Sequence, residues 1–340
     1  MAPTLPTRPL GKDGPQVTAL GFGMMGLSFM YGPVPSDEER LQFLDHVYES
    51  GQRFWDTSDL YGDSEALLGK WFARSGKREE IFLASKFGFV TSGPRKGIRS
   101  DPDYVKEACE KSLKTMGVKT IDLYYVHRVD MKTPIEETVE AMVELKKEGK
   151  ITYLGLSEVS SETVRRAHKV HPISAVQIEY SPFTMDIESP STGLLSTCRE
   201  LGIAIVAYAP LGRGILSGTI KSPDDFGPTD YRKYLPRFSK DNFVKNSELV
   251  DQLKAVADEK GVPVGTLTLA WVMAQGEEII PIPGTSKAGH FDENMMALGV
   301  QITKEENERI RAAVNHATIA GDRYDPNSMK ICFADTPLPK

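Results

Sequence analysis

The chain has 340 residues, of which 40% are hydrophobic and 26% charged, and its formal net charge at pH 7 is −6. This is the composition of a globular protein with a large core, and the absence of a basic block disfavours nucleic acid or an anionic membrane as the main partner. No stretch approaches the roughly 18 consecutive apolar residues of a membrane span, and the first eight residues lack the apolar run of a signal peptide. We therefore expect a cytoplasmic protein. Cys109, Cys198 and Cys332 are far apart without metal-binding spacing, which indicates reduced thiols and no metal site.

Short apolar segments alternate along the chain with amphipathic helical segments. Strands are expected at 20–23, 53–56, 81–86, 121–127, 153–157, 175–179, 204–208 and 279–283, followed by helices at 37–50, 64–74, 102–116, 134–148, 161–168, 192–201, 248–260 and 292–298. The strands are apolar almost throughout rather than alternating, which is typical of a parallel sheet buried on both faces. Eight strand–helix units predict an α/β fold, the closed (β/α)8 or TIM barrel.

An open doubly wound sheet is the alternative, because residues 21–26 match the G-x-G-x-x-G pattern of a dinucleotide-binding turn. That pattern is weak alone, and no acidic residue follows the second strand in the expected context. We expect residues 1–340 to form one domain, with an N-terminal β-hairpin at 8–20, a long loop at 213–246 after the seventh strand and a tail at 318–340. An additional helix is expected at 264–275 and a last helix at 304–316. The loop and the tail are expected to wall a substrate pocket over the barrel mouth.

Polar side chains stand at the carboxyl ends of three consecutive predicted strands. Asp56, Lys86 and His127 end the second, third and fourth strands, and Tyr61 follows Asp56 in the same turn. Each alone has a structural interpretation, as a turn former, surface charge, core imidazole or packing residue. In a barrel, however, the carboxyl ends of all strands converge on the active-site face. We therefore predict that these four residues form an active site, with Lys86 lowering the pKa of the Tyr61 phenol.

Two further carboxylates in this stretch lack partners at neighbouring strand ends. Asp59 and Asp63 are therefore interpreted as turn and helix-cap residues.

With these motifs the sequence resembles the aldo-keto reductase superfamily over nearly its whole length. The matching segments are Leu-Gly-Phe-Gly at 20–23, Asp-Thr-Ser at 56–58, Leu-Tyr-Tyr-Val-His at 123–127, Gly-Leu-Ser at 155–157, Ala-Pro-Leu-Gly-Arg-Gly at 209–214 and Ile-Pro-Gly-Thr at 282–285 with Glu293-Asn294. The family's catalytic Asp, Tyr, Lys and His match Asp56, Tyr61, Lys86 and His127 in type, order and context. Glu158 and the segment Gly-Asp-Arg-Tyr at 321–324 resemble the perakine-reductase-like and auxin-induced branch.

The resemblance implies NADPH-dependent reduction of an aldehyde or ketone to the alcohol, with NADH a less favoured cofactor. Tyr61 would act as general acid, Lys86 would stabilise the phenolate, Asp56 would hold the ammonium, and a neutral His127 would polarise the carbonyl. No side chain can itself donate hydride, so a nicotinamide cofactor is required.

The resemblance also implies a set of cofactor-binding residues. Ser157 and Gln177 would hold the carboxamide, and Tyr208 would stack on the nicotinamide. The pyrophosphate would be wrapped by Leu211, Gly212, Arg213 and Gly214, and the 2′-phosphate would be bound by Gly284, Thr285 and Lys287. Glu293 and Asn294 would contact adenine, and the site would be completed by Gly23, Met24, Pro210, Ile282 and His290. Core packing is the alternative for Tyr208. Glu158 stands where many members have Asn, and His290 where many have an Arg that clamps the 2′-phosphate. A mostly neutral imidazole is a poorer phosphate partner, for which Lys287 would compensate.

The predicted substrate pocket has an apolar, Met-rich character. Met25, Phe29, Tyr31, Phe87 and Arg128 are assigned to it, although about half of such residues would simply pack the loops. These side chains favour a small-molecule carbonyl substrate with an apolar or aromatic body rather than a charged sugar. The protein is expected to be a monomer or weak homo-oligomer.

Two other functional classes remain open. Potassium-channel β subunits resemble this family and bind the cofactor as regulatory subunits, but generally carry Asn where this chain has His127. A barrel isomerase or aldolase would instead use Lys86 as a Schiff-base amine. The neighbouring Tyr61 and the predicted pyrophosphate loop argue against the latter class.

Overall fold

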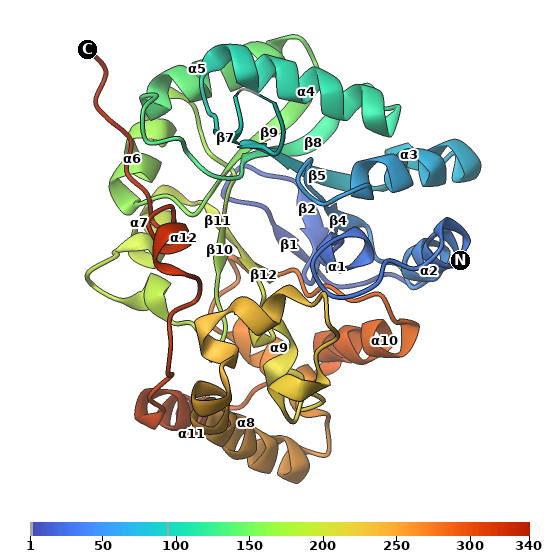
Figure 1. Ribbon diagram of the computed structural model, residues 1–340, viewed down its shortest axis with the longest axis vertical. Helices are drawn as coiled ribbons and strands as arrows, with labels where there is room; N and C mark the ends of the chain where they lie inside the picture. The colour runs from blue at the N-terminus through green and yellow to red at the C-terminus, as the bar shows by residue number, and fades with distance from the viewer. Residues whose placement is uncertain (1–2, 94) are drawn as a thin grey trace.

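The fold is built around an eight-stranded parallel sheet, seen in a computed structural model that describes residues 3–93 and 95–340. Its strands are β3 (Phe22–Gly23), β4 (Phe54–Asp56), β5 (Phe82–Phe87), β8 (Ile121–Val126), β9 (Ile151–Ser157), β10 (Ala175–Glu179), β11 (Ala204–Tyr208) and β12 (Ile279–Pro281). Neighbours pair in the order β12-β11-β10-β9-β8-β5-β4-β3. All eight predicted strands are present, and helices surround them (Figure 1). The predicted (β/α)8 architecture is confirmed.

The barrel closes where the first strand meets the last. The Gly21 N–H donates to the Pro281 carbonyl oxygen at 2.9 Å, and the Gly23 N–H donates to that of Pro283 at 3.2 Å. A Cβ at Gly23 would lie 2.8 Å from the Ile282 carbonyl oxygen, and one at Gly284 would lie 2.7 Å from the Gly23 oxygen. Real Cβ atoms do not approach backbone so closely, so these two glycines are required for the closing seam.

Most of the helices lie where the apolar periodicity and local cap residues predict them. The helices next to the sheet are α2 (Asp37–Glu49), α3 (Ser64–Ser75), α4 (Pro102–Met116), α5 (Ile135–Lys147), α6 (Ser161–Val170), α7 (Leu194–Leu201), α9 (Val264–Ala274) and α10 (Ala288–Met296). The Ser36 hydroxyl and the Glu39 carboxylate form a capping box at the start of α2. Gly117 ends α4 with a φ of 65°, a left-handed conformation that glycine adopts at little cost.

The assignment of the helix in the seventh unit is corrected by the structure. The sequence predicts that residues 248–260 form this helix and that residues 264–275 form an additional one. Instead, α9 contacts β12, whereas α8 (Lys240–Lys260) packs against α11 (Lys304–His316) at the outer edge of the molecule (Figure 1). The reason is burial: α9 is apolar almost all round and buried along most of its length, whereas α8 has a polar outer face.

The remaining elements cover the two ends of the barrel. A hairpin of β1 (Thr7–Pro9) and β2 (Gln16–Thr18) precedes the barrel as predicted, and a second small hairpin joins β6 (Phe89–Val90) to β7 (Gly97–Ile98). Leu10 and Val17 of the first hairpin pack against the barrel interior. The short helices are α1 (Met25–Ser28), α12 (Pro326–Met329) and the 3-10 turns η1 (Arg78–Glu80), η2 (Asp186–Glu188), η3 (Gly212–Ser217), η4 (Pro223–Asp225), η5 (Tyr231–Tyr234), η6 (Pro236–Phe238) and η7 (Ala297–Gly299). Among the residues that the structure describes, none of the helices combines the length and apolar character needed to span a bilayer.

The long loop and the tail both have defined structure. The loop contains η3 to η6 and ends earlier than predicted, because the Ser239 hydroxyl accepts from the Asn242 N–H and starts α8 at Lys240. The tail runs back along the outside of α6 (Figure 1). It is fastened there by the Ala334 N–H, which donates to the Glu158 carbonyl oxygen at 2.9 Å, and by the Arg166 guanidinium, which donates to the Thr336 carbonyl oxygen at 2.7 Å.

Candidate active site

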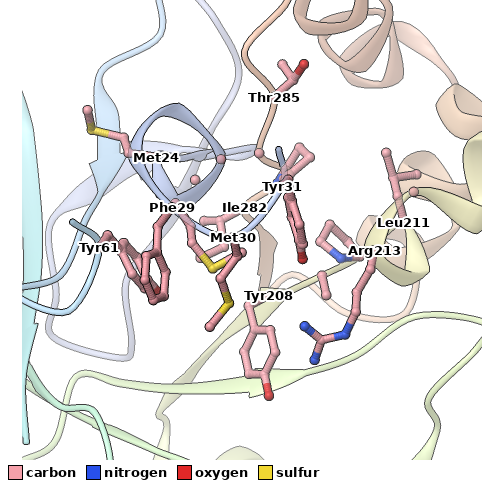
Figure 2. A pocket seen from close by; sticks show the side chains of 18 of the residues that line it. Met24, Phe29, Met30, Tyr31, Tyr61, Tyr208, Leu211, Arg213, Ile282 and Thr285 are labelled. Atoms are coloured by element: carbon pink, nitrogen blue, oxygen red, sulfur yellow. The ribbon is translucent and has the colours of Figure 1, made fainter. Parts of the chain in front are cut away.

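A cavity of about 670 Å³ opens at the carboxyl ends of the barrel strands. Of the predicted site residues, those that line it are Gly23, Met24, Met25, Phe29, Tyr31, Asp56, Tyr61, His127, Arg128, Ser157, Gln177, Tyr208, Pro210, Leu211, Arg213, Gly214, Ile282, Gly284, Thr285, Lys287, His290, Glu293 and Asn294. The loop contributes Ser217, Thr219, Ile220, Tyr231 and Arg232 to its wall, and the tail contributes Tyr324, Ser328 and Ile331. Figure 2 shows Phe29 beside Tyr61 on one side of this cavity, and Tyr208 with Arg213 on the other. Segments far apart in the sequence therefore meet around one cavity.

Three predicted site residues, Lys86, Phe87 and Gly212, are not among the described residues that line the cavity. Phe87 is buried in the core, where its ring stacks on Tyr124 with ring centroids 5.0 Å apart, so its assignment to the substrate pocket is wrong. Neighbouring strand residues point to opposite faces, and Lys86 takes the inward position, so Phe87 faces the helices. Gly212 is also buried, and it begins the turn that carries Arg213.

Lys86 lies at the centre of the predicted catalytic cluster and is completely buried. Its Nζ donates to Asp56 Oδ1 at 2.5 Å and to the Thr57 carbonyl oxygen at 2.6 Å, and lies 3.5 Å from the Tyr61 hydroxyl. Gln177 Nε2 donates to Asp56 Oδ2 at 2.8 Å, so both carboxylate oxygens are held. Burial alone would lower the pKa of Lys86, but the Asp56 carboxylate is the main influence that opposes burial, and the pKa is raised. The amine is therefore a fixed cation beside the phenol.

Two opposing effects set the pKa of Tyr61. Burial raises the pKa of its phenol and Lys86 opposes this effect, but the net pKa stays above the ordinary value. Lys86 thus lowers the pKa in the predicted direction, but the desolvation cost of a buried phenolate exceeds the attraction of one ammonium. Lys86 reduces the cost of a phenolate without removing it, and the resting phenol keeps its proton.

His127 is held neutral at the cavity wall. Burial, followed by the charges of Arg128 and Lys86, lowers its pKa well below the ordinary value. Ser58 Oγ lies 3.1 Å from its Nδ1, and its ring meets that of Tyr61 edge-on with centroids 5.8 Å apart. A neutral imidazole, a phenol and an ammonium thus share one corner of the cavity.

A buried ionic network on the opposite side of the cavity was missed by the sequence interpretation. Glu158, with a left-handed φ of 54°, accepts from Arg323 Nη1 at 2.8 Å and from the Tyr208 hydroxyl at 2.6 Å. Its carboxylate therefore fastens the tail and Tyr208. Glu179 accepts from Arg213 Nη2 at 2.9 Å. As the last residue of β10, Glu179 follows the same strand-end rule that identified Asp56 and Lys86, and that signal was available in the sequence.

The turn at 211–214 is only partly suited to the predicted pyrophosphate role. The N–H groups of Gly212 and Gly214 donate to the carbonyl oxygens of Ala209 and Leu211, both at 2.9 Å, and are therefore used within the turn. The Arg213 side chain lines the cavity but is paired with Glu179. At the far end of the cavity, Lys287 and His290 are exposed at the start of α10 and have no such partner within the part of the chain that the structure describes.

Asp63 does not act as the expected helix cap, and the carboxyl of Asp59 has an unusual pKa. Asp63 precedes α3 but makes no cap hydrogen bond, because its two oxygens accept from Arg40 at 2.7 and 2.8 Å. Hydrogen bonding to Arg40 is the main cause that lowers the pKa of Asp63 to about 2. Asp59 lies in the turn as predicted, but burial raises the pKa of its carboxyl to about 7.

We expect Asp59→Asn to stabilise the protein at pH 8 and to have little effect at pH 4. The folded-state pKa of Asp59 lies above the unfolded value, so ionisation costs stability as pH rises from about 4 to 7, and the cost is complete above pH 7. Removing it should increase the free energy of unfolding by about 4 kcal/mol at pH 8. Urea unfolding at both pH values measures this. Asp63→Asn, the matched control, should destabilise at pH 8, and a stabilisation that is equal at both pH values would contradict the assignment.

The fold and this cavity define the class of protein as a (β/α)8 barrel with a buried lysine–aspartate pair, a phenol and a neutral imidazole at its mouth. The chain belongs to the aldo/keto reductase family, which matches residues 19–315. The family resemblance found in the sequence is thereby confirmed.

Similar proteins support this membership over almost the full length. Aldo-keto reductase str7 of Strobilurus tenacellus is 53% identical over 324 residues, covering 94% of this chain and 95% of the relative. Aldo-keto reductase yakc [NADP(+)] of Schizosaccharomyces pombe is 47% identical over 343 residues, covering 99% and 100%. The solved structure of glycerol dehydrogenase AKR11B4 from Gluconobacter oxydans superposes with a TM-score of 0.81 at 26% identity, covering 94% of this chain and 98% of that one. The thermostable aldo-keto reductase Tm1743, solved with the inhibitor epalrestat, gives a TM-score of 0.73 at 26% identity, covering 91% and 100%.

Proposed function

We propose that the protein reduces an aldehyde or ketone to the alcohol with NADPH, with Tyr61 as the general acid. The observation that carries this proposal is the position of Lys86. Its wholly buried ammonium joins Asp56 to the Tyr61 hydroxyl at the cavity wall, 2.5 Å from Asp56 Oδ1 and 3.5 Å from the phenol oxygen. Such a cation stabilises negative charge on the phenol oxygen only while a proton is being given up, and this is the requirement for acid catalysis.

The cavity residues fit a nicotinamide cofactor. The cavity extends from Tyr61 and His127 to the exposed Lys287, so a long ligand with an anionic end can reach both. Ser157 and Gln177 would hold the carboxamide, Tyr208 would pack on the nicotinamide ring, and Lys287 with the start of α10 would bind a 2′-phosphate. The name of the Schizosaccharomyces pombe relative specifies NADP(+), which supports the same cofactor here. When bound, the cofactor supplies the hydride that no side chain can provide.

The side chains around the carbonyl position divide the remaining work. Tyr61 donates its proton to the developing alkoxide, Lys86 stabilises the resulting phenolate, and Asp56 with Gln177 keeps the ammonium in place. We assign Ser58 as the donor to His127 Nδ1, which leaves the Nε2 proton free to bind the carbonyl oxygen. An oxygen held by both the phenol and the imidazole is polarised before transfer.

The proposal is tested by following NADPH oxidation with a panel of aromatic aldehydes, aliphatic aldehydes, pyridoxal and bulky ketones. We expect turnover of at least one aromatic or apolar carbonyl, because Met25, Phe29 and Phe89 contribute an apolar wall beside Tyr61. Complete inactivity with retained NADPH binding would instead support the cofactor-binding regulatory function. The raised pKa and complete burial of Lys86 argue against a Schiff-base mechanism, because a charged amine is not a nucleophile.

We expect the KM for NADPH to be at least tenfold lower than the KM for NADH. Lys287 carries the charge for this preference, because its exposed ammonium lies at the start of α10, at the end of the cavity where a 2′-phosphate would bind. Lys287→Ala should raise the KM for NADPH about tenfold, the value of one charge-assisted hydrogen bond, and leave the KM for NADH nearly unchanged. Steady-state kinetics with both cofactors measure this, with Lys304→Ala on exposed α11 as the control. Equal KM values for the two cofactors in the unaltered protein would contradict the preference.

A further inference from the structure

Arg128 is a buried cation at the cavity wall that makes no salt bridge within the described residues; the charge of Glu158 acts on it from a greater distance, but that carboxylate is paired with Arg323. The residue is 7% exposed, and its Nη1 donates to the His127 carbonyl oxygen at 2.7 Å and to Ser157 Oγ at 3.3 Å. Its Nε is buried without a hydrogen-bond partner. Within residues 3–93 and 95–340, no carboxylate oxygen lies within 4.0 Å of its guanidinium. Buried charges are ordinarily paired, so an unpaired guanidinium facing a cavity indicates a ligand that supplies the anion.

The neighbouring carboxylates are already occupied by other guanidinium groups. Glu158 is paired with Arg323 at 2.8 Å, and Glu179 is paired with Arg213 at 2.9 Å and approached by Arg237 at 3.6 Å. The carboxylates of Glu158 and Glu179 are 0% and 2% exposed. Two buried carboxylates therefore face three guanidinium groups before Arg128 is counted. Asp186, half exposed, lies 4.0 Å from Arg323 and offsets part of this excess, but it is not in contact with Arg128.

We propose that Arg128 binds a carboxylate of the substrate, so that the preferred substrates are carbonyl compounds with an apolar or aromatic body and one carboxylate. This inference rests on the reductase function proposed above and narrows its substrate class. A planar guanidinium offers parallel N–H donors that match the two oxygens of a carboxylate.

The position of Arg128 indicates that the anion belongs to the substrate rather than to a cofactor phosphate. Arg128 follows His127 directly and contacts Ser157, so it lies at the catalytic end of the cavity, whereas Lys287 marks the opposite end. Its positive charge also helps to lower the pKa of His127. At Tyr61 it opposes the rise in pKa that burial causes. Phe29 and Phe89, which contact the Tyr61 and His127 rings, provide the apolar surface for the body of the substrate.

The test compares carboxybenzaldehydes with their methyl esters, because each pair has the same ring and the same aldehyde but only one member has a charge. We expect at least one of the 2-, 3- and 4-carboxy isomers to exceed its ester tenfold or more in kcat/KM with the unaltered protein. Arg128→Met should reduce that acid-to-ester ratio to one or below, and Arg128→Lys should retain part of it. Arg78→Met, which removes a largely buried arginine that pairs with Asp122 away from the cavity, should leave the ratio unchanged.

Several results would overturn the proposal. A preference for the ester with all three isomers would do so without any variant, so the test does not depend on the folding of Arg128→Met. An acid preference that survives in both Arg128 variants would also exclude the assignment. A raised KM for NADPH with an unchanged acid-to-ester ratio would assign Arg128 to the cofactor carboxamide instead.

Failure of the reductase function can be separated from failure of this inference. Turnover of unsubstituted benzaldehyde tests the reductase function alone. If no aldehyde is reduced, calorimetric titration of the protein and NADP+ with 3- and 4-(hydroxymethyl)benzoate still tests the carboxylate site. Binding at least tenfold weaker in Arg128→Met supports the site, whereas no binding to the unaltered protein, or equal binding to both, refutes it.

Discussion

Replacing Tyr61 with phenylalanine should lower kcat for carbonyl reduction by about 1,000-fold and leave the affinity for NADPH nearly unchanged. The phenol is the one proton donor within 3.5 Å of the Lys86 ammonium among the described residues, and phenylalanine keeps the ring that stacks on Phe29. The loss should therefore fall on the chemical step rather than on binding or folding.

Single-turnover NADPH oxidation measures the chemical step, and quenching of protein fluorescence by NADPH measures affinity. Tyr124→Phe is the matched control, because it removes a buried hydroxyl that has no hydrogen-bond partner and lies outside the cavity wall. That variant should keep near-normal turnover. A Tyr61→Phe protein with near-normal kcat would remove Tyr61 from the mechanism.

Replacing Glu158 with glutamine should destabilise the folded protein by about 3 kcal/mol at pH 7. Burial raises the pKa of this carboxyl, but the charges of Arg323 and Arg128 outweigh burial and hold the pKa at about 2. The ionised carboxylate therefore contributes stability above its unfolded pKa near 4.5, and that stability is lost as pH falls from about 4.5 to 2. Its removal also leaves the buried Arg323 guanidinium without its main partner, which adds to the cost.

Urea unfolding at pH 7 and pH 4 gives the size and the pH dependence of this effect. The difference between the unaltered protein and Glu158→Gln should shrink toward the lower pH, and hydrogen exchange in the tail should become faster in the variant. Glu200→Gln breaks an exposed pair with Arg165 and should have a much smaller effect. Equal losses in the two variants would show that the buried pair has no special role in holding the tail.

Local features of the sequence predicted much of the fold because they act over short distances. The boundaries of α4 and α11 were predicted at both ends, since the Asp101 and Thr303 caps and the following helical residues are adjacent in the chain. The assignment of α8 and α9 failed because both segments are good helices. Which of them lies against β12 depends on the burial of the whole surface of α9, and helical periodicity alone does not report it.

The candidate site was predictable to the extent that strand ends converge. Asp56, Lys86 and His127 were expected to meet because each ends a parallel strand, and the structure brings all three to the same end of the barrel. The prediction for Phe87 failed because a position near a strand end does not by itself decide which face of the sheet a side chain occupies; side chains alternate between the two faces. The same alternation, applied to the inward Lys86, would have placed Phe87 in the outer core.

By itself, the sequence determined the barrel, the order of its strands and the residue types that stand at the barrel mouth. The tertiary structure decided the charge balance of the cavity. Glu158 and Arg323 are 165 positions apart, and nothing in their local sequence shows that they form a buried pair. Whether a buried group is paired sets its pKa, because the desolvation cost is offset only by charges that the fold brings close. For that reason the raised pKa of Tyr61, the low pKa of Glu158 and the unpaired charge of Arg128 emerged only from the folded chain.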